Sequence, residues 1–178
     1  MKLSLRFEAP HAGLEHSYRT LVREFLEAGE PLVPFPLAFA NEDFAAFLDK
    51  LSACARGEGI PEGFVPHSTY WLVHHGSEVV GVSNLRHRLT DALRFEGGHI
   101  GYGVRPTARR RGFATELLRH TLAQARDLGV REAWLTCGKT NTASIQTILR
   151  NNGIFVSEEF IPRRAEVVQR YRIPLESA

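Results

Sequence analysis

The chain has 178 residues, of which 43% are hydrophobic and 24% are charged, and its formal net charge is +2. This composition is typical of a globular domain, and a charge so close to neutral argues against a dedicated nucleic-acid-binding protein. Two cysteines are too few for a disulfide framework or a zinc site, so we expect no bound metal and a reducing, cytoplasmic location. No apolar run has the length of a membrane span, so we expect no membrane partner.

The N-terminal part of the chain predicts one strand and two helices. Residues 2–8 alternate between apolar and charged side chains, which is the period of a strand. Apolar residues then recur at helical spacing from Leu14 onward, and Gly29 ends this helix. Asn41 is a suitable N-cap for a second helix, whose apolar face extends to Ala55.

The middle of the chain predicts a hairpin followed by a third strand. Residues 69–75 and 78–86 have strand-like composition, and the Gly76-Ser77 pair between them is typical of a type II′ turn. A third strand follows over residues 98–104, where apolar and small residues alternate.

The C-terminal part alternates helix and strand. A helix over about 112–128 separates the third of these strands from residues 130–137, and a crossover of this kind predicts a parallel pair. Asn141 is suited to cap a shorter helix. Residues 154–160 and 167–173 are the last two predicted strands.

The turn that leads into the helix at 112–128 carries the most informative motif. Three arginines at 109–111 precede Gly112, and Ala114 follows two positions later. A helix start presents free N–H groups and a positive dipole end, and small residues let a phosphate approach the backbone. A P-loop is excluded because no Gly-Lys-Ser/Thr tripeptide is present, and the glycine spacing of a dinucleotide fingerprint is also absent. A solvated turn is the structural alternative.

A third known pattern, Arg/Gln-x-x-Gly-x-Gly/Ala, is present as Arg109-Arg110-Arg111-Gly112-Phe113-Ala114. After a strand that ends Val-Arg-Pro and before an amphipathic helix, this segment resembles the pyrophosphate-binding loop of the GNAT superfamily of acyl-CoA-dependent N-acyltransferases. The predicted element order is also the GNAT order, so the resemblance covers nearly the whole chain and implies one domain over residues 1–178. Three segments are similar to a bacterial subgroup of predicted acetyltransferases: 84–89, 97–102 and 136–141.

The resemblance implies an α/β (α+β) fold with a mixed, mostly antiparallel central sheet of about seven strands and flanking helices. The strands at 98–104 and 130–137 are implied to splay apart, with the pantetheine of acetyl-CoA in the gap. The implied cofactor-binding residues come from the strand end, the loop and the next helix: Val104, Arg109, Arg110, Arg111, Gly112, Phe113, Ala114, Thr115, Asn141 and Ser144. For Asn141, a plain helix N-cap is the alternative.

Acetyl transfer requires that the attacking amine lose a proton, and His99 is the first candidate for the base. Glu96 is the second candidate and would act through water. For His99 the structural alternative is a half-buried histidine bonded to a neighbouring strand. In members of the family, a tyrosine on the helix after Asn141 commonly gives a proton to the leaving thiolate. Here Ile148 stands at that position, so the residue that acts as the general acid is unassigned. Cys137 fits a core position better than a nucleophile.

We therefore expect an N-acetyltransferase that moves an acetyl group from acetyl-CoA to a primary amine by direct attack in a ternary complex. The expected acceptor is a small-molecule or peptide amine, and the exposed sheet edges of such a fold favour a homodimer. The cluster of Arg86, His87, Arg88 and Arg94 would border the acceptor and is suited to an acceptor with a carboxylate or phosphate; a solvated strand end is the favoured alternative. Two alternatives stay open: a non-catalytic acyl-CoA-binding module, and a nucleic-acid-binding protein whose binding would be steeply salt-dependent.

Overall fold

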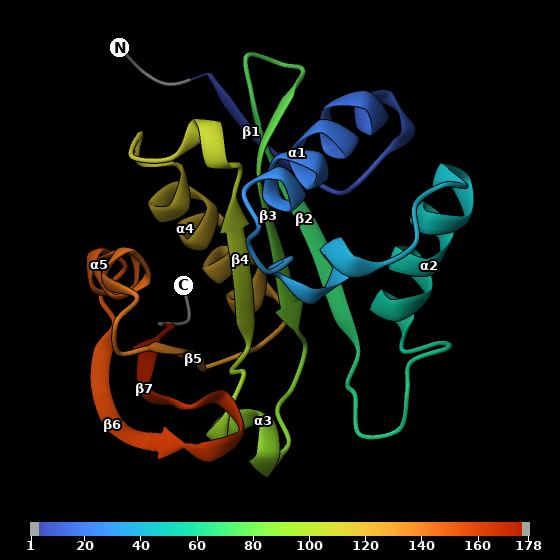
Figure 1. Ribbon diagram of the computed structural model, residues 1–178. Helices are drawn as coiled ribbons and strands as arrows, with labels where there is room; N and C mark the ends of the chain where they lie inside the picture. The colour runs from blue at the N-terminus through green and yellow to red at the C-terminus, as the bar shows by residue number, and fades with distance from the viewer. Residues whose placement is uncertain (1–3, 176–178) are drawn as a thin grey trace.

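Seven strands form two antiparallel sheets in the computed structural model, which describes residues 4–175 (Figure 1). The first sheet has the order β1-β2-β3-β4 and the second has the order β5-β7-β6. The strand bounds are β1 Leu5–Glu8, β2 His67–His74, β3 Glu78–Arg86, β4 Ile100–Val104, β5 Glu132–Gly138, β6 Ile154–Ile161 and β7 Glu166–Pro174. The predicted mostly antiparallel α+β fold is confirmed, with the difference that the strands divide into two sheets.

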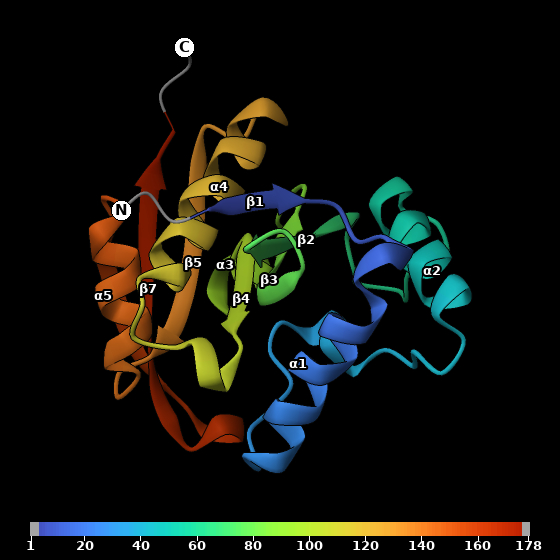
Figure 2. The same cartoon turned by 90° about the horizontal axis from the view of Figure 1, so that it is seen from above.

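Helices cover both faces of the first sheet. The helices have the bounds α1 Glu15–Glu27, α2 Phe44–Arg56, α3 Asp91–Phe95, α4 Phe113–Asp127 and α5 Thr142–Arg150, and of these α1, α2 and α4 cover the first sheet. α1 and α2 lie on one side of the first sheet, and α4 lies on the other (Figure 2). On the first side Tyr18 of α1 stacks on Trp71 of β2, with ring centroids 4.9 Å apart. On the other side α4 buries Phe113 and Leu117 against β2 and β3.

The spacing of apolar residues in α4 explains how it packs. Leu117, Leu118, Leu122 and Ala125 fall at helical spacing and are all buried. Thr121 lies on the same face, and its hydroxyl bonds both the Leu117 carbonyl and a serine hydroxyl of β3, each at 2.7 Å. The buried hydroxyl of Thr121 therefore has hydrogen-bond partners, which offsets the free energy cost of removing it from water.

The two sheets meet at the start of β4 and then separate. Gly98 has a φ of +66°, and a Cβ added there would lie 2.9 Å from the Cα of Leu135 in β5, so only glycine allows this approach. The next residue, His99, donates its N–H to the Trp134 carbonyl at 2.6 Å. In the described part of the chain, β4 and β5 form no ladder beyond this point, and the expected parallel pairing is replaced by an opening.

Two predictions of local structure are wrong. Asp43, rather than Asn41, caps α2 by accepting the Ala46 N–H at 3.0 Å. The hairpin turn has positive φ at both His75 and Gly76, as a type I′ turn requires, rather than the type II′ pattern expected at Gly76-Ser77. The predicted strand at 2–8 begins within residues 1–3, which lie outside the described residues.

Two further observations bear on the class of protein. None of the helices within 4–175 combines the length and apolar character that a membrane crossing requires. The same residues contain no group of three or more histidine, cysteine, aspartate or glutamate side chains arranged to hold a metal ion.

Candidate active site

A cavity of about 520 Å³ lies where the two sheets separate. One wall is the end of β4, from Tyr102 to Val104, and the opposite wall is the face of α5 from Ala143 to Arg150. The loop before α4 and its first turn form the floor, and Glu30 lies at the rim. Sequence segments that resemble a cofactor site therefore meet at one cavity.

The loop before α4 presents an unusual row of free backbone donors. In residues 4–175 no oxygen accepts a hydrogen bond from the six N–H groups of residues 110–115. Arg110 and Gly112 both adopt left-handed conformations, with φ values of +61° and +83°, which turn the loop around these groups. Free N–H groups together with the positive end of the α4 dipole form an anion site. The predicted phosphate-binding loop runs from Arg109 to Thr115, and its role in binding stays a prediction; of its N–H groups, that of Arg109 is already bonded to Pro106.

Arg109, the first residue of the motif, does not present its side chain to this anion site. Its N–H donates to the Pro106 carbonyl at 3.4 Å. Its guanidinium donates to both carboxylate oxygens of Glu30, at 2.7 and 2.6 Å, and to the Val104 carbonyl at 3.2 Å. These bonds lower the pKa of Glu30 below its ordinary value. Arg109 therefore ties the loop to β4 and to the segment that follows α1.

Arg111 and Phe113 also have mainly structural side chains. Phe113 is 1% exposed and packs in the core beneath the loop. The Arg111 guanidinium lies over the Phe113 ring, 4.9 Å from its centroid, and Arg111 is not among the residues that line the cavity. The Arg111 side chain therefore faces away from the cavity lining, which in this turn is formed by Gly112, Phe113, Ala114 and Thr115.

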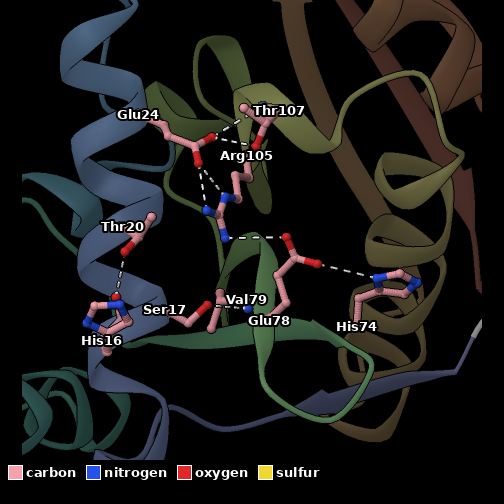
Figure 3. Close-up of polar contacts among 9 residues, drawn as sticks. All are labelled: His16, Ser17, Thr20, Glu24, His74, Glu78, Val79, Arg105 and Thr107. Atoms are coloured by element: carbon pink, nitrogen blue, oxygen red, sulfur yellow. Dashed lines mark hydrogen bonds and ion pairs between the residues drawn. The ribbon is translucent and has the colours of Figure 1, made fainter.

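A polar network braces the segment that enters the loop against α1 (Figure 3). Glu24 of α1 accepts from the Arg105 Nε at 2.7 Å and from the Thr107 N–H and hydroxyl at 3.2 and 2.8 Å. Arg105 also reaches Glu78 at 3.5 Å, and Glu78 is 3.4 Å from His74. Both partners of the Arg105–Glu24 pair are largely buried. α1 therefore holds both ends of the short turn between β4 and the loop.

The start of α5 lies across the cavity from β4. Asn141 caps α5 by accepting the Ser144 N–H at 3.1 Å, as the structural alternative predicts, and it also lines the cavity. The Ser144 hydroxyl lies 3.0 Å from the hydroxyl of Tyr102. Burial raises the pKa of Tyr102 to about 12, although the bond to Ser144 lowers it slightly. Tyr102 therefore keeps its proton at neutral pH.

His99 lies beside the cavity, outside its lining. It is 7% exposed, and its Nδ1 accepts the Trp134 N–H at 2.9 Å, so this nitrogen is already occupied. Burial and the positive charges of Arg94 and Arg86 lower the pKa of His99 to about 4. These contacts match the structural alternative for His99, and its catalytic role stays a prediction.

Glu96, the second candidate for the base, also lies outside the lining of this cavity. It pairs with Arg163 and with Arg164, the latter at 3.4 Å, across the gap between α3 and the β6–β7 turn. Burial alone would raise the pKa of Glu96, but the bonds and charges of the two arginines outweigh it and lower the pKa. Its catalytic role likewise stays a prediction.

Two other polar candidates are occupied or buried. Arg86, expected near the acceptor, donates instead to the carbonyls of Gly97 and Gly98, at 3.3 and 2.8 Å. Cys137 is buried, and burial raises the pKa of its thiol to about 11, so it is not a thiolate at neutral pH.

Several residues that line the cavity are absent from the predicted site, among them Tyr102, Glu30 and Arg150. Tyr102 alternates like a core residue of its strand, and nothing local shows that the neighbouring strand has moved away. Glu30 lies 79 positions before Arg109, so their pairing has no local signal. Arg150 lies at the end of α5, about two turns from Ser144. Its spacing of three residues from Thr147 and six from Ser144 places it on the same helix face, and this is the local signal that indicates it.

The fold and the cavity define a mixed α/β protein in which a helix start with free N–H groups lies at the opening between two strands. The sequence model of the Acetyltransferase (GNAT) family matches residues 18–154, which is most of the chain. The chain therefore belongs to this family, and its class of enzyme is a transferase. A comparison with curated proteins finds no match.

Solved structures share the fold at low sequence identity. An acetyltransferase from Salmonella typhimurium, which modifies the N-terminal serine of ribosomal protein L7/L12, is 15% identical, with a TM-score of 0.69 and coverage of 99% of this chain and 97% of that one. The microcin C7 self-immunity acetyltransferase MccE, in complex with acetyl-CoA and AMP, is 13% identical, with a TM-score of 0.68 and coverage of 98% and 94%. A chimera of the spermidine N-acetyltransferase SpeG from Vibrio cholerae and hSSAT is 14% identical, with a TM-score of 0.61 and coverage of 96% and 94%.

Proposed function

We propose that this protein is an N-acetyltransferase that transfers the acetyl group of acetyl-CoA to a primary amine by direct attack in a ternary complex. The observation that carries the proposal is the row of free N–H groups at residues 110–115, at the floor of a cavity of about 520 Å³. Such a cradle suits a diphosphate, because backbone donors bind phosphate oxygens without a fixed positive side chain.

The residues around the cavity fit an extended acyl-CoA. The N–H groups of residues 110–115 would hold the pyrophosphate. The end of β4 at Val104 and the start of α5 at Asn141 and Ser144 would border the pantetheine. Acetyl-CoA supplies the activated thioester, and the thiolate that leaves has an ordinary pKa of roughly 8.5, so a proton donor assists its departure without being essential.

Tyr102 is the donor that this proposal assigns. Its hydroxyl reaches the Ser144 hydroxyl across the cavity at 3.0 Å, and a pKa of about 12 keeps the phenol protonated. Tyr102 of β4 would thus donate the proton that, in members of the family, commonly comes from a tyrosine at the position of Ile148. For the opposite task, removal of the amine proton, His99 and Glu96 stay the predicted candidates. Because neither lines the cavity, each would act through water.

The acceptor is proposed to be an amine of a small molecule or a peptide. The relatives named above act on a ribosomal protein N-terminus and on spermidine, which are both amines. A cytoplasmic location and a homodimer stay predictions. The competing proposal, a non-catalytic acyl-CoA-binding module, rests on the tyrosine missing at Ile148.

Thermal unfolding with and without acetyl-CoA tests the cofactor, with ATP and NADH as controls. Ligand at a hundred times its Kd stabilises by about 2.7 kcal/mol, which for a chain of this length raises the Tm by roughly 5–10 °C. Thr115→Asp places a carboxylate in the first turn of α4, where it favours the helix but repels a phosphate. We expect Thr115→Asp to lose the shift and the isosteric Thr115→Asn to keep it. No shift for the unaltered protein at millimolar acetyl-CoA would refute the proposal.

Release of CoA in the presence of a panel of amines separates the transferase from the binding module. Small amines, amino acids and peptides with free N-termini should be included, and acetylated product should be detected by mass. A protein that binds acetyl-CoA but acetylates no member of a broad panel would favour the binding module.

A further inference from the structure

The charged residues of the cavity are unequally compensated. Four charged side chains line it: Glu30, Arg109, Arg110 and Arg150. Arg109 is neutralised by its two bonds to Glu30. Within residues 4–175, Arg110 and Arg150 have no carboxylate partner, and no hydrogen bond engages either guanidinium. The cavity therefore carries two uncompensated positive charges.

These two arginines come from different elements that are fixed to each other. Arg110 lies in the loop, in the left-handed conformation with a φ of +61°. Arg150 is in the last turn of α5, and its neighbour Asn151 is 8% exposed. The Asn151 amide donates to the Thr115 carbonyl of α4 at 3.2 Å and to the Thr147 carbonyl at 3.0 Å. This amide holds the end of α5 against the first turn of α4, so Arg150 and Arg110 line the same cavity.

The backbone cradle and the two arginines are suited to different anions. Backbone N–H groups at residues 110–115 suffice for a diphosphate that lies against the loop. Guanidinium groups from two elements instead suit a compact, doubly charged group, because each can donate two hydrogen bonds to its oxygens. A phosphomonoester has this chemistry.

We propose that Arg110 and Arg150 form a second anion site, which binds the 3′-phosphate on the ribose of the acyl-CoA and selects it over the 3′-dephospho form. This inference rests on the proposed function, because it names what the same cavity recognises besides the diphosphate. It makes the two arginines determinants of cofactor specificity, with no part in the chemistry.

Binding of CoA and of 3′-dephospho-CoA to the full chain tests the proposal by titration calorimetry at fixed ionic strength. We expect the unaltered protein to bind CoA at least about 10-fold more tightly than 3′-dephospho-CoA. Arg150→Gln and Arg110→Gly should each weaken CoA binding several-fold, and together they should bring the ratio close to 1. The affinity for 3′-dephospho-CoA should stay nearly unchanged, because that ligand lacks the group the arginines bind.

The variants are chosen to leave the fold intact. Arg150 is exposed, and glycine accepts the left-handed conformation at position 110 without strain. Arg126→Gln, an exposed residue of α4 beside Asp127, is the charge-matched control and should leave the ratio unchanged. Equal affinity of the unaltered protein for the two ligands would overturn this inference alone, as would an equal loss for both ligands in the variants. Failure of the unaltered protein to bind either ligand would overturn the proposed function as well.

Discussion

Glu24 braces the segment that leads into the loop before α4, so its loss should destabilise the protein measurably. Its carboxylate accepts three hydrogen bonds from Arg105 and Thr107 and pairs with the Arg105 Nη2 at 2.6 Å. Both side chains of the pair are about 13–14% exposed. Glu24→Ala leaves the Arg105 guanidinium with Glu78 at 3.5 Å as its remaining partner. Breaking a buried pair costs about 3–5 kcal/mol, and partial exposure reduces this to about 2–4 kcal/mol.

Urea unfolding followed by circular dichroism measures this cost. Because 1 kcal/mol shifts the Tm of a chain of this size by roughly 2–4 °C, we also expect the Tm to fall by roughly 4–16 °C. Glu27→Ala is the control on the same helix, because Glu27 lies 3.7 Å from Arg23 and both side chains are more than 60% exposed. The control should cost less than about 0.5 kcal/mol. Equal losses for the two variants would refute the reasoning.

The pH dependence of the Glu24 contribution has a defined sign. Burial raises the pKa of this carboxyl, but the bonds from Arg105 and Thr107 outweigh burial, so the folded-state pKa lies below the ordinary value. The stabilisation is therefore present above the unfolded-state pKa, about 4.3, and is lost as the pH falls through the folded-state pKa. The stability gap between the unaltered protein and Glu24→Gln should close under acid conditions, and a gap that widens on acidification would contradict this assignment.

Three further predictions concern the cavity and the contact between the sheets. Tyr102→Phe should lower kcat by roughly 100-fold, with little change in the KM for acetyl-CoA, because it removes a proton donor but keeps the ring. Ser144→Ala is its control for the lost hydrogen bond, and an unchanged kcat in Tyr102→Phe would exclude the assigned role. Gly98→Ala should destabilise by roughly 3 kcal/mol in urea, because its Cβ meets β5 backbone and its φ is +66°; a loss below about 1 kcal/mol would contradict the close contact. His99→Asn keeps an acceptor for the Trp134 N–H. Since the folded pKa of His99 is about 4 and the unfolded value is about 6.5, the unaltered protein should lose about 1.4 kcal/mol per pH unit between these values. The variant should not lose this part of the free energy of unfolding on acidification. Identical dependence of stability on pH in the two proteins would show that His99 is not buried in its neutral form.

The parts of the fold that the sequence predicts are those with a local period or a local motif. α4 combines helical spacing with a preceding glycine, so its buried face and its free N–H groups both follow from the amino-acid sequence alone. The cap of α2 was missed because Asn41 and Asp43 are both suitable, and the choice depends on Arg19 of α1. Arg19 donates to the side-chain carbonyl oxygen of Asn41 at 3.0 Å, so the asparagine is already used. A tertiary contact decided between two equal local signals.

In the candidate site, too, the local sequence predicts the backbone feature, whereas tertiary contacts decide the side-chain pairing. The motif predicts where the loop with free N–H groups lies, but three arginines in a row give no indication of which one is neutralised. Arg109 pairs with Glu30, 79 positions earlier, whereas Arg110 has no carboxylate partner in the described residues. The outcome depends on how α1 crosses the end of β4, and no periodicity encodes that crossing.

The opening between β4 and β5 gives this molecule two inner strand edges that face each other. Beyond His99 the main-chain groups along these edges are not joined in a ladder within the described residues. A facing pair of edges is a template for an extended molecule with amide groups, which would lie there as a short additional strand. Recognition of this kind uses backbone atoms that every residue type possesses, so it places few demands on side-chain identity.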